Sequence, residues 1–196
     1  TVSYLEGVNV PPFMIVSVTH RCNLQCSGCY SKVNHSADKP DMSDNDLLSI
    51  FKQAKELGTS IALLSGGEPL KRSGLFSITR EFPGMLFPLF TNGLLIDDSY
   101  IKIFRQQSNI VPIISLEGTE FDIDNRRGTG VHSRVLKVLE SMKQHRVFFG
   151  VSFTVTKENV LTITDSNYVR ELMRLGVYLF FYNEYILLLQ VTESQL

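Results

Sequence analysis

Three cysteines lie close together in this sequence, and it contains no others. They are Cys22, Cys26 and Cys29, spaced C-x3-C-x2-C in a polar stretch that also contains Gly28. Cysteines that serve only packing would be scattered through apolar runs, whereas clustered thiolates on a loop typically bind a soft metal ion or an iron–sulfur cluster. A cubane cluster takes one thiolate per iron, so three thiolates would leave one iron able to bind a small molecule.

Zinc is the alternative metal for this stretch. A closed zinc site can use three cysteines and one histidine, and His20 and His35 flank the cysteines. The cysteine stretch favours iron–sulfur chemistry but leaves both metals open, and the rest of the chain has to separate them.

Composition is typical of a globular protein. The chain has 196 residues, of which 43% are hydrophobic and 20% charged, so one domain with a substantial core is expected. A net charge of −1 gives no indication of nucleic-acid binding, and no apolar run approaches the length of a membrane span. One tight cysteine cluster does not suit a disulfide framework, and the N-terminus lacks a secretion signal, so we expect a cytoplasmic protein.

Short β-branched or aromatic runs alternate with longer segments at helical spacing. The expected strands are residues 13–18, 61–64, 85–90, 110–116, 147–155 and 177–182. The expected helices begin after Ser43, near Leu75, at Asp97, near Val131 and near Val169. This alternation predicts a parallel sheet with helices outside it. Six strands are too few for the usual eight-stranded closed barrel, so the predicted fold is α/β, a partial open (β/α)6 barrel with parallel strands.

Two segments fall outside this alternation. Residues 31–41 are polar and are expected to form a mobile loop. Residues 186–196 are apolar at first and then stop, which suits either a truncated last helix or the stub of a further segment. We therefore expect residues 1–196 to form a single core domain, and a truncated C-terminal end is one interpretation of this ending.

Each expected strand is followed by polar or glycine-bearing residues, and in parallel α/β folds the active site lies at the carboxyl ends of the strands. In strand order these are the three cysteines, Ser65 to Pro69, Asn92 and Gly93, Ser115 with Glu117 and Gly118, Thr154, and Asn183 with Glu184. Any one of them could be a simple turn, because Gly and Pro dominate turns. Six on the same rim predict a site.

The three-cysteine loop and Gly66-Gly67-Glu68-Pro69 together resemble the radical S-adenosylmethionine (radical SAM) enzymes. The likeness extends from Ile15 to about Tyr185. It implies a [4Fe-4S] cluster on the three cysteines, with S-adenosylmethionine chelating the free iron through its amino and carboxylate groups. It further implies reductive cleavage of the sulfonium to a 5′-deoxyadenosyl radical, which takes a hydrogen atom from a peptide or small-metabolite substrate. A reductant such as flavodoxin or ferredoxin is the expected protein partner.

The resemblance also implies residues that bind the cofactor. Ser65 to Pro69 would lie along its methionine part, with Gly66 and Gly67 admitting a ligand close to the backbone. Pro69 would fix the exit from the turn. Glu68 could accept a hydrogen bond from the ligand ammonium or orient the turn, and we favour the orienting role.

A third stretch, with Ser115 and Gly118 followed by Arg126 and Arg127, is similar to the subgroup that contains anaerobic sulfatase-maturating enzymes and the molybdenum-cofactor cyclase. In that subgroup the strand-end serine and a later arginine contact the cofactor. The likeness therefore implies Ser115 and Arg127, since a guanidinium suits a carboxylate. Arg126 is the alternative register, and a solvated surface arginine is the alternative role. Two further strand-end candidates for cofactor binding are Asn92 and Thr154.

Two departures from the family pattern bear on function. Gly28 stands where an aromatic residue is common, so only a backbone contact to the adenine is expected there. No cysteine follows Cys29, so this chain cannot build an auxiliary cluster. Two other functions stay open: a non-catalytic zinc- or iron–sulfur-binding module with a degraded barrel, and an enzyme whose substrate is fixed by a missing C-terminal part. Of the remaining polar residues, His20 and Arg21 are expected to shape the cysteine loop, and His145 to be a solvated helix end.

Overall fold

The computed structural model describes residues 10–29, 31 and 40–185. Most of the expected polar loop at 31–41 lies outside these residues, as do His35 and the apolar ending at 186–196. No helix in the described ranges is both long and apolar enough to cross a membrane.

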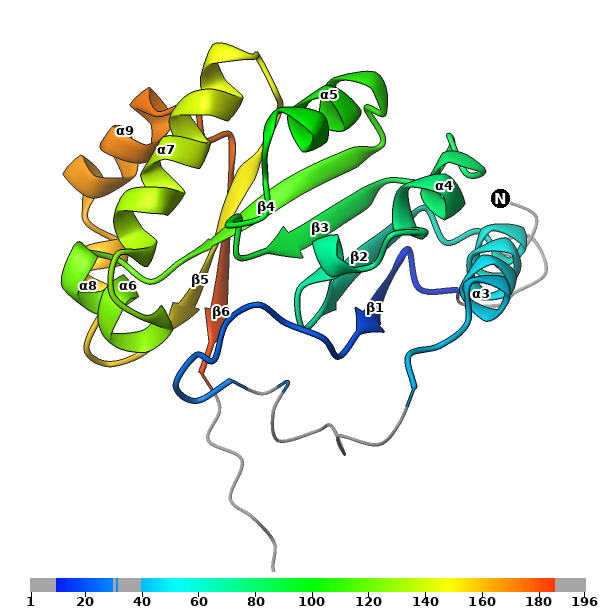
Figure 1. Cartoon of the computed structure of the whole chain (residues 1–196), viewed down its shortest axis with the longest axis horizontal. Helices are drawn as coiled ribbons and strands as arrows, with labels where there is room; N and C mark the ends of the chain where they lie inside the picture. The colour runs from blue at the N-terminus through cyan, green and yellow to red at the C-terminus, as the bar shows by residue number, and fades with distance from the viewer. Residues whose placement is uncertain (1–9, 30, 32–39, 186–196) are drawn as a thin grey trace, which may run out of the picture.

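Six parallel strands pair in chain order to form one sheet. They are β1 (Phe13–Thr19), β2 (Ile61–Gly66), β3 (Phe87–Thr91), β4 (Ile110–Leu116), β5 (Gly150–Val155) and β6 (Leu179–Glu184). Their carboxyl ends point to one edge of the sheet, and the segment after β1 crosses beneath that edge (Figure 1). The predicted open (β/α)6 half-barrel is confirmed.

One aromatic contact between two strands that are not neighbours shows that the sheet is curved. Phe90 on β3 and Phe181 on β6 pack edge to face with ring centroids 5.3 Å apart. Two strands separate β3 from β6, and in a flat sheet that would place them about 14 Å apart. The sheet is therefore rolled, and these rings meet on its concave side.

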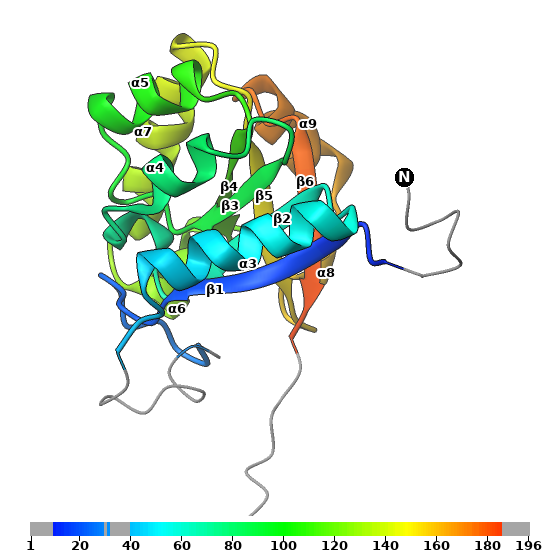
Figure 2. The ribbon, with the colours of Figure 1, turned by 90° about the vertical axis from the view of Figure 1, so that its right-hand side faces the viewer.

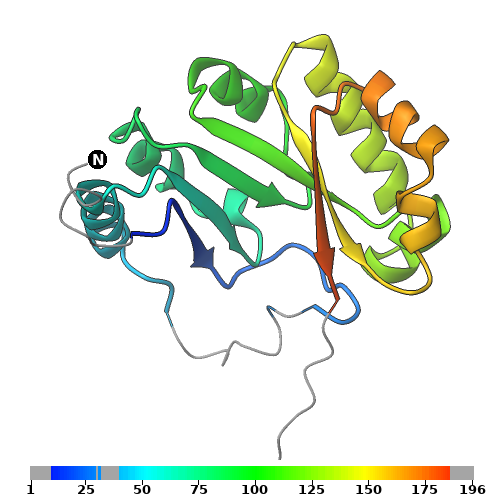
Figure 3. The same cartoon turned by 180° about the vertical axis from the view of Figure 1, so that it is seen from behind.

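Helices cover the convex side of the sheet (Figure 3). They are α3 (Asp44–Leu57), α4 (Leu75–Arg80), α5 (Asp98–Gln106), α6 (Glu120–Arg127), α7 (Val131–Gln144), α8 (Val160–Ile163) and α9 (Ser166–Arg174), with a 3-10 turn η1 at Pro69–Lys71. Figure 2 shows α3 lying along β1 and β2. The core lies between the two layers, where alternate strand residues such as Leu64 and Val151 pack with Phe51 and Leu139 of the helices.

The helix ends follow from local sequence. The Ser43 hydroxyl accepts the Asp46 N–H at the start of α3, and Gly58 ends that helix with a left-handed φ of 105°. Asp97 accepts the N–H groups of Ser99 and Tyr100 at the start of α5. These local signals mark where α3 and α5 begin and where α3 ends.

Some expected bounds were wrong. β3 begins at Phe87 rather than residue 85, β5 at Gly150 rather than 147, and β6 at Leu179 rather than 177. No helix was expected between the fourth strand and the helix near Val131, but the structure has α6 there. It begins with a capping box: the Thr119 hydroxyl accepts the Asp122 N–H, and the Asp122 carboxylate accepts the Thr119 N–H. Arg126 and Arg127 therefore lie in the last turn of a helix.

Candidate functional site

The cysteine loop, residues 20–43 as far as they are described, leaves β1 and returns to α3. All three thiols are free, with Cys22 exposed and Cys26 and Cys29 partly buried. The loop runs along the carboxyl edge of the sheet towards the end of β6 (Figure 1). None of the three belongs to the hydrophobic core, so they are available as ligands.

The turn after β2 binds the start of this loop through its backbone. The Gly67 N–H donates to the carbonyl oxygen of Thr19 (2.7 Å), and the Glu68 N–H donates to that of Arg21 (2.8 Å). A Cβ atom on Gly66 would overlap the Thr19 carbonyl, and one on Gly67 would overlap the carbonyls of Arg21 and His20. The glycines therefore admit the chain's own backbone; their expected contact with a ligand stays a prediction.

Glu68 is fully buried and connects the ends of β2 and β3. Its Oε1 accepts from the Thr91 hydroxyl (2.7 Å) and the Leu70 N–H (3.1 Å), while Oε2 accepts from the Asn92 N–H (2.8 Å). Burial raises the pKa of Glu68, and these hydrogen bonds oppose the rise. Each of these contacts of the Glu68 carboxylate is with the protein backbone or a hydroxyl, which suits the orienting role; its contact with a ligand stays a prediction. Pro69 is buried at the first position of η1.

Asn92 follows β3 and reaches the cysteine loop. Its Nδ2 donates to Oδ1 of Asn23 (2.8 Å) and lies 4.0 Å from Sγ of Cys22. Its Oδ1 accepts the Leu94 N–H (2.9 Å), which fixes the orientation of the amide. Asn92 therefore contacts the residue beside the first cysteine.

Glu117 is a buried carboxylate that pairs with two arginines. Arg126 Nη1 is 2.7 Å from Oε2, and Arg127 donates to Oε1 through Nε (3.1 Å) and Nη2 (2.5 Å). Arg126 also binds the cysteine loop, because its carbonyl accepts the Ser27 N–H (2.8 Å) and its Nε donates to the Ser27 carbonyl (3.3 Å). The negative charge of Glu117 balances only one of the two guanidiniums, so one net positive charge remains beside the cysteines.

The pKa of Cys26 is influenced by both the other cysteines and the arginines of α6. Burial raises the pKa of the Cys26 thiol, the Arg127 guanidinium lowers it, and the neighbouring Cys29 and Cys22 raise it. The three thiols and Arg127 therefore lie within electrostatic reach of one another. Soft thiolates beside a positive group form a donor set that suits an iron–sulfur cluster.

Of the two histidines expected beside the cysteines, only His20 belongs to the described residues, and its ring is paired with a carboxylate. The His20 ring lies against Asp41, with Nδ1 2.6 Å from Oδ1, and His35 is outside the described residues. Within the described ranges, no three His, Cys, Asp or Glu side chains are grouped to hold a single metal ion. A cubane makes a different demand, because each thiolate binds a different iron.

The remaining expected residues line the concave side of the strand ends. Ser115 pairs in register with Ser152 of β5, and Thr154 with Asn183 of β6. Asn183 donates to the Ser152 hydroxyl (3.0 Å). Ser65 lies in register with Ser17 of β1, and its hydroxyl is 3.5 Å from the Val16 carbonyl. His145 ends α7 and is exposed, as expected.

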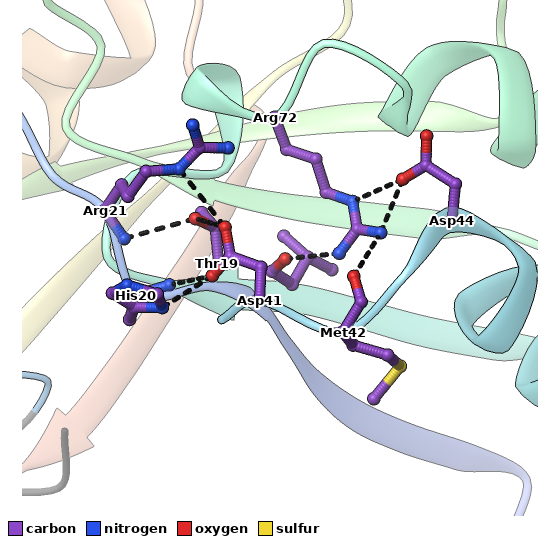
Figure 4. Close-up of polar contacts among 8 residues, drawn as sticks. Thr19, His20, Arg21, Asp41, Met42, Asp44 and Arg72 are labelled. Atoms are coloured by element: carbon purple, nitrogen blue, oxygen red, sulfur yellow. Dashed lines mark hydrogen bonds and ion pairs between the residues drawn. The ribbon is translucent and has the colours of Figure 1, made fainter. Parts of the chain in front are cut away.

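Sequence reasoning missed the base of the cysteine loop. Asp41 accepts from the Thr19 hydroxyl and the backbone of His20, and Arg72 connects β1 to the segment before α3 (Figure 4). Partial burial alone would raise the pKa of Asp41, but these hydrogen bonds and the nearby His20 and Arg21 hold it below its ordinary value. No motif marks either residue, since both lie outside the periodic segments.

Residues 16–165 of the chain match the family model described as the Radical SAM superfamily. Fe-coproporphyrin III synthase of Methanosarcina barkeri is 30% identical over 156 residues, covering 78% of this chain and 39% of that protein. AdoMet-dependent heme synthase of the same organism is 28% identical over 178 residues, covering 88% of this chain and 51% of the relative. The chain therefore spans 39% and 51% of the length of these two curated relatives.

Two solved structures have the same fold. Streptococcus suis SuiB bound to S-adenosylmethionine superposes with a TM-score of 0.80 and 20% identity, covering 98% of this chain and 45% of SuiB. The structure of anSMEcpe with bound AdoMet gives a TM-score of 0.69 and 23% identity, covering 89% of this chain and 51% of that protein. At these identities the likeness is one of architecture.

Proposed function

This chain belongs to the radical SAM superfamily, and from that membership we propose that it is the core of an enzyme that cleaves S-adenosylmethionine reductively. The family uses a [4Fe-4S] cluster and S-adenosylmethionine. The observation that carries the proposal is the backbone contact between the glycine turn and the cysteine loop, Gly67 to Thr19 and Glu68 to Arg21. It joins the two motifs of the family into one structure at the carboxyl edge of the sheet.

We assign the cluster to Cys22, Cys26 and Cys29. Together, cluster and cofactor would supply one-electron cleavage of the sulfonium to methionine and a 5′-deoxyadenosyl radical, which takes a hydrogen atom from the substrate. The protein supplies the orientation of both. The residues assigned to S-adenosylmethionine are Ser65, Gly66, Gly67, Glu68, Pro69, Asn92, Ser115, Arg127 and Thr154. Since Nε and Nη2 of Arg127 are directed to Glu117, we assign its contact with the cofactor carboxylate to Nη1.

The proposed substrate is a peptide or a small metabolite. SuiB has been solved with a precursor peptide, and the curated relatives are named for the synthesis of heme and Fe-coproporphyrin III, so both classes have support. The proposed chemistry consumes one electron per cleavage, for which a flavodoxin or ferredoxin is the proposed donor. A cytoplasmic location suits a cluster with reduced thiolates.

The test is anaerobic reconstitution of the full-length protein, followed by incubation with S-adenosylmethionine and a strong reductant. We expect about four irons per chain, as for one cubane, and formation of 5′-deoxyadenosine without added substrate. Tightly bound zinc without charge-transfer absorption would contradict the cluster. A loaded cluster that yields no 5′-deoxyadenosine would instead support the non-catalytic module.

Arg127→Ala is expected to weaken S-adenosylmethionine binding by roughly one to two powers of ten. The cofactor carboxylate would lose a charged donor, which costs on the order of 1–3 kcal/mol, at about 1.4 kcal/mol per tenfold. Iron content should stay the same, because Arg127 is not one of the three ligands assigned to the cluster. Equilibrium binding of the cofactor to the reconstituted protein measures the effect.

Arg105→Ala, in the last turn of α5, is the matched control and should bind the cofactor normally. Arg126→Ala tests the register: a loss of affinity in this variant and none in Arg127→Ala would move the assignment by one residue. Normal affinity in both variants would show that neither arginine binds the carboxylate.

A further inference from the structure

The start and the end of the cysteine loop meet at the side chain of Asp41. Its Oδ2 accepts from the Thr19 hydroxyl (2.7 Å) and from Nε of Arg21 (3.2 Å), and its Oδ1 accepts the His20 N–H (2.9 Å). The His20 ring is also 2.6 Å from Oδ1. Figure 4 shows the three residues converging on the carboxylate. One side chain therefore binds three consecutive residues, the last of which directly precedes Cys22.

Arg72 fastens the same two segments together beside Asp41. Its side chain is only 5% exposed. Its Nη1 donates to the Val18 carbonyl (2.6 Å), and its Nη2 donates to the Met42 carbonyl (2.9 Å) and to Oδ1 of Asp44 (2.6 Å). The end of β1 and the approach to α3 are thus joined through a buried guanidinium as well as through Asp41 (Figure 4).

The contacts made by Asp41 and by Arg126 fall at two separate places along the loop. Asp41 binds the residues just before Cys22, while Arg126 binds Ser27, which lies between Cys26 and Cys29. The ordering entropy of a loop grows with its length, so cysteines on a long connection need such contacts to stay near one another. The first contact governs where Cys22 lies, and the second governs the other two cysteines.

We propose that Asp41 is a positioning residue for the cluster: it closes the base of the cysteine loop and so places Cys22 opposite Cys26 and Cys29 before any metal binds. The inference rests on the proposed function, because it assigns Asp41 a role toward a cluster on these thiolates. Asp41 touches neither the thiols nor the assigned cofactor residues; it acts through the Thr19 hydroxyl, the backbone N–H of His20 and the side chain of Arg21.

The test compares Asp41→Ala and Asp41→Asn with Asp97→Ala. Asp97 is the control, since like Asp41 it is a carboxylate that accepts both backbone N–H and hydroxyl donors, here two N–H groups and the Ser99 hydroxyl, but at the start of α5 and without contact to the loop. The first readout is amide hydrogen exchange of the peptide covering residues 19–24 in the metal-free protein. The second is the rate at which reconstituted protein loses iron to a chelator.

In Asp41→Ala we expect faster amide exchange in residues 19–24 and iron loss that is about tenfold faster. A factor of about ten is the effect that one hydrogen bond to a charged group has on an equilibrium. Asp97→Ala should match the wild type in both readouts. Asp41→Asn should lie between, because its Oδ1 can still accept the His20 N–H. It also serves as the test variant if Asp41→Ala fails to fold.

Unchanged exchange in residues 19–24, or unchanged iron loss, in the Asp41 variants would overturn the inference. So would equal effects in Asp97→Ala, which would indicate general destabilisation. Failure of the proposed function is distinguishable from these outcomes. If the wild type held no four-iron cluster, the proposed enzyme chemistry and the cluster role of Asp41 would both fail, while the exchange readout would still report on loop closure.

Discussion

Cys26→Ala is expected to abolish cluster binding and 5′-deoxyadenosine formation while leaving the fold intact. The proposed cubane has three cysteine ligands, and this sequence contains no fourth cysteine that could replace one of them. The fold should survive because Cys26 lies outside the hydrophobic core, and substitutions away from the core usually change stability by about 0.5 kcal/mol or less. Iron analysis and visible absorption measure the first effect, and thermal unfolding of the metal-free protein measures the second.

Gln25→Ala is the control for this prediction. Gln25 is exposed and directly precedes Cys26, so its replacement should retain about four irons. A Cys26→Ala protein that keeps its iron, or that does not fold without metal, would contradict the assignment of Cys26 as a ligand with no structural role.

Gly67→Ala is expected to displace the cysteine loop and to remove most of the bound iron. The new methyl group would overlap the carbonyls of Arg21 and His20, which are backbone atoms and cannot move alone. Overpacking of this kind typically costs about 1–3 kcal/mol, and here the strain falls on the segment that leads to Cys22. Urea unfolding and iron content after reconstitution measure the two consequences.

Gly84→Ala provides the comparison. No heavy atom lies within 4 Å of a Cβ at Gly84, so this variant should stay within about 0.5 kcal/mol of the wild type and bind iron normally. If Gly67→Ala bound iron as Gly84→Ala does, the close passage of the loop against the turn would not matter for the cluster.

Most of the fold could be predicted from the sequence because most elements bury a repeating apolar set. Leu47, Phe51 and Ala54 mark α3 in this way. Helix α6 could not be found by the same rule, since Ile123 is its only buried residue and the apolar stripe is missing. Its capping box was the available signal, in the pair Thr119 and Asp122.

The site was predictable as motifs but not as contacts. The cysteine loop and the glycine turn each stand out in the sequence. That the glycines admit the loop itself follows only from the pairing of β1 with β2, which sets Thr19 beside Gly66. Asp41 and Arg72 carry no periodic or motif signal, because their partners combine backbone groups that any sequence provides with side chains that lie more than twenty positions away in the sequence.

The contact between Ser27 and Arg126 also bears on when the site can form during synthesis. These residues are 99 positions apart in the chain, whereas Asp41 is within 22 positions of Thr19. The N-terminal residues of a chain are synthesised first. The base of the cysteine loop can therefore close long before α6 has been made. A nascent chain that ends before residue 120 carries all three cysteines but cannot hold Ser27 in place. A metal that binds during that interval would meet thiols on a loop that is held only near Cys22. A correctly formed site therefore requires that β4 and α6 have already been made.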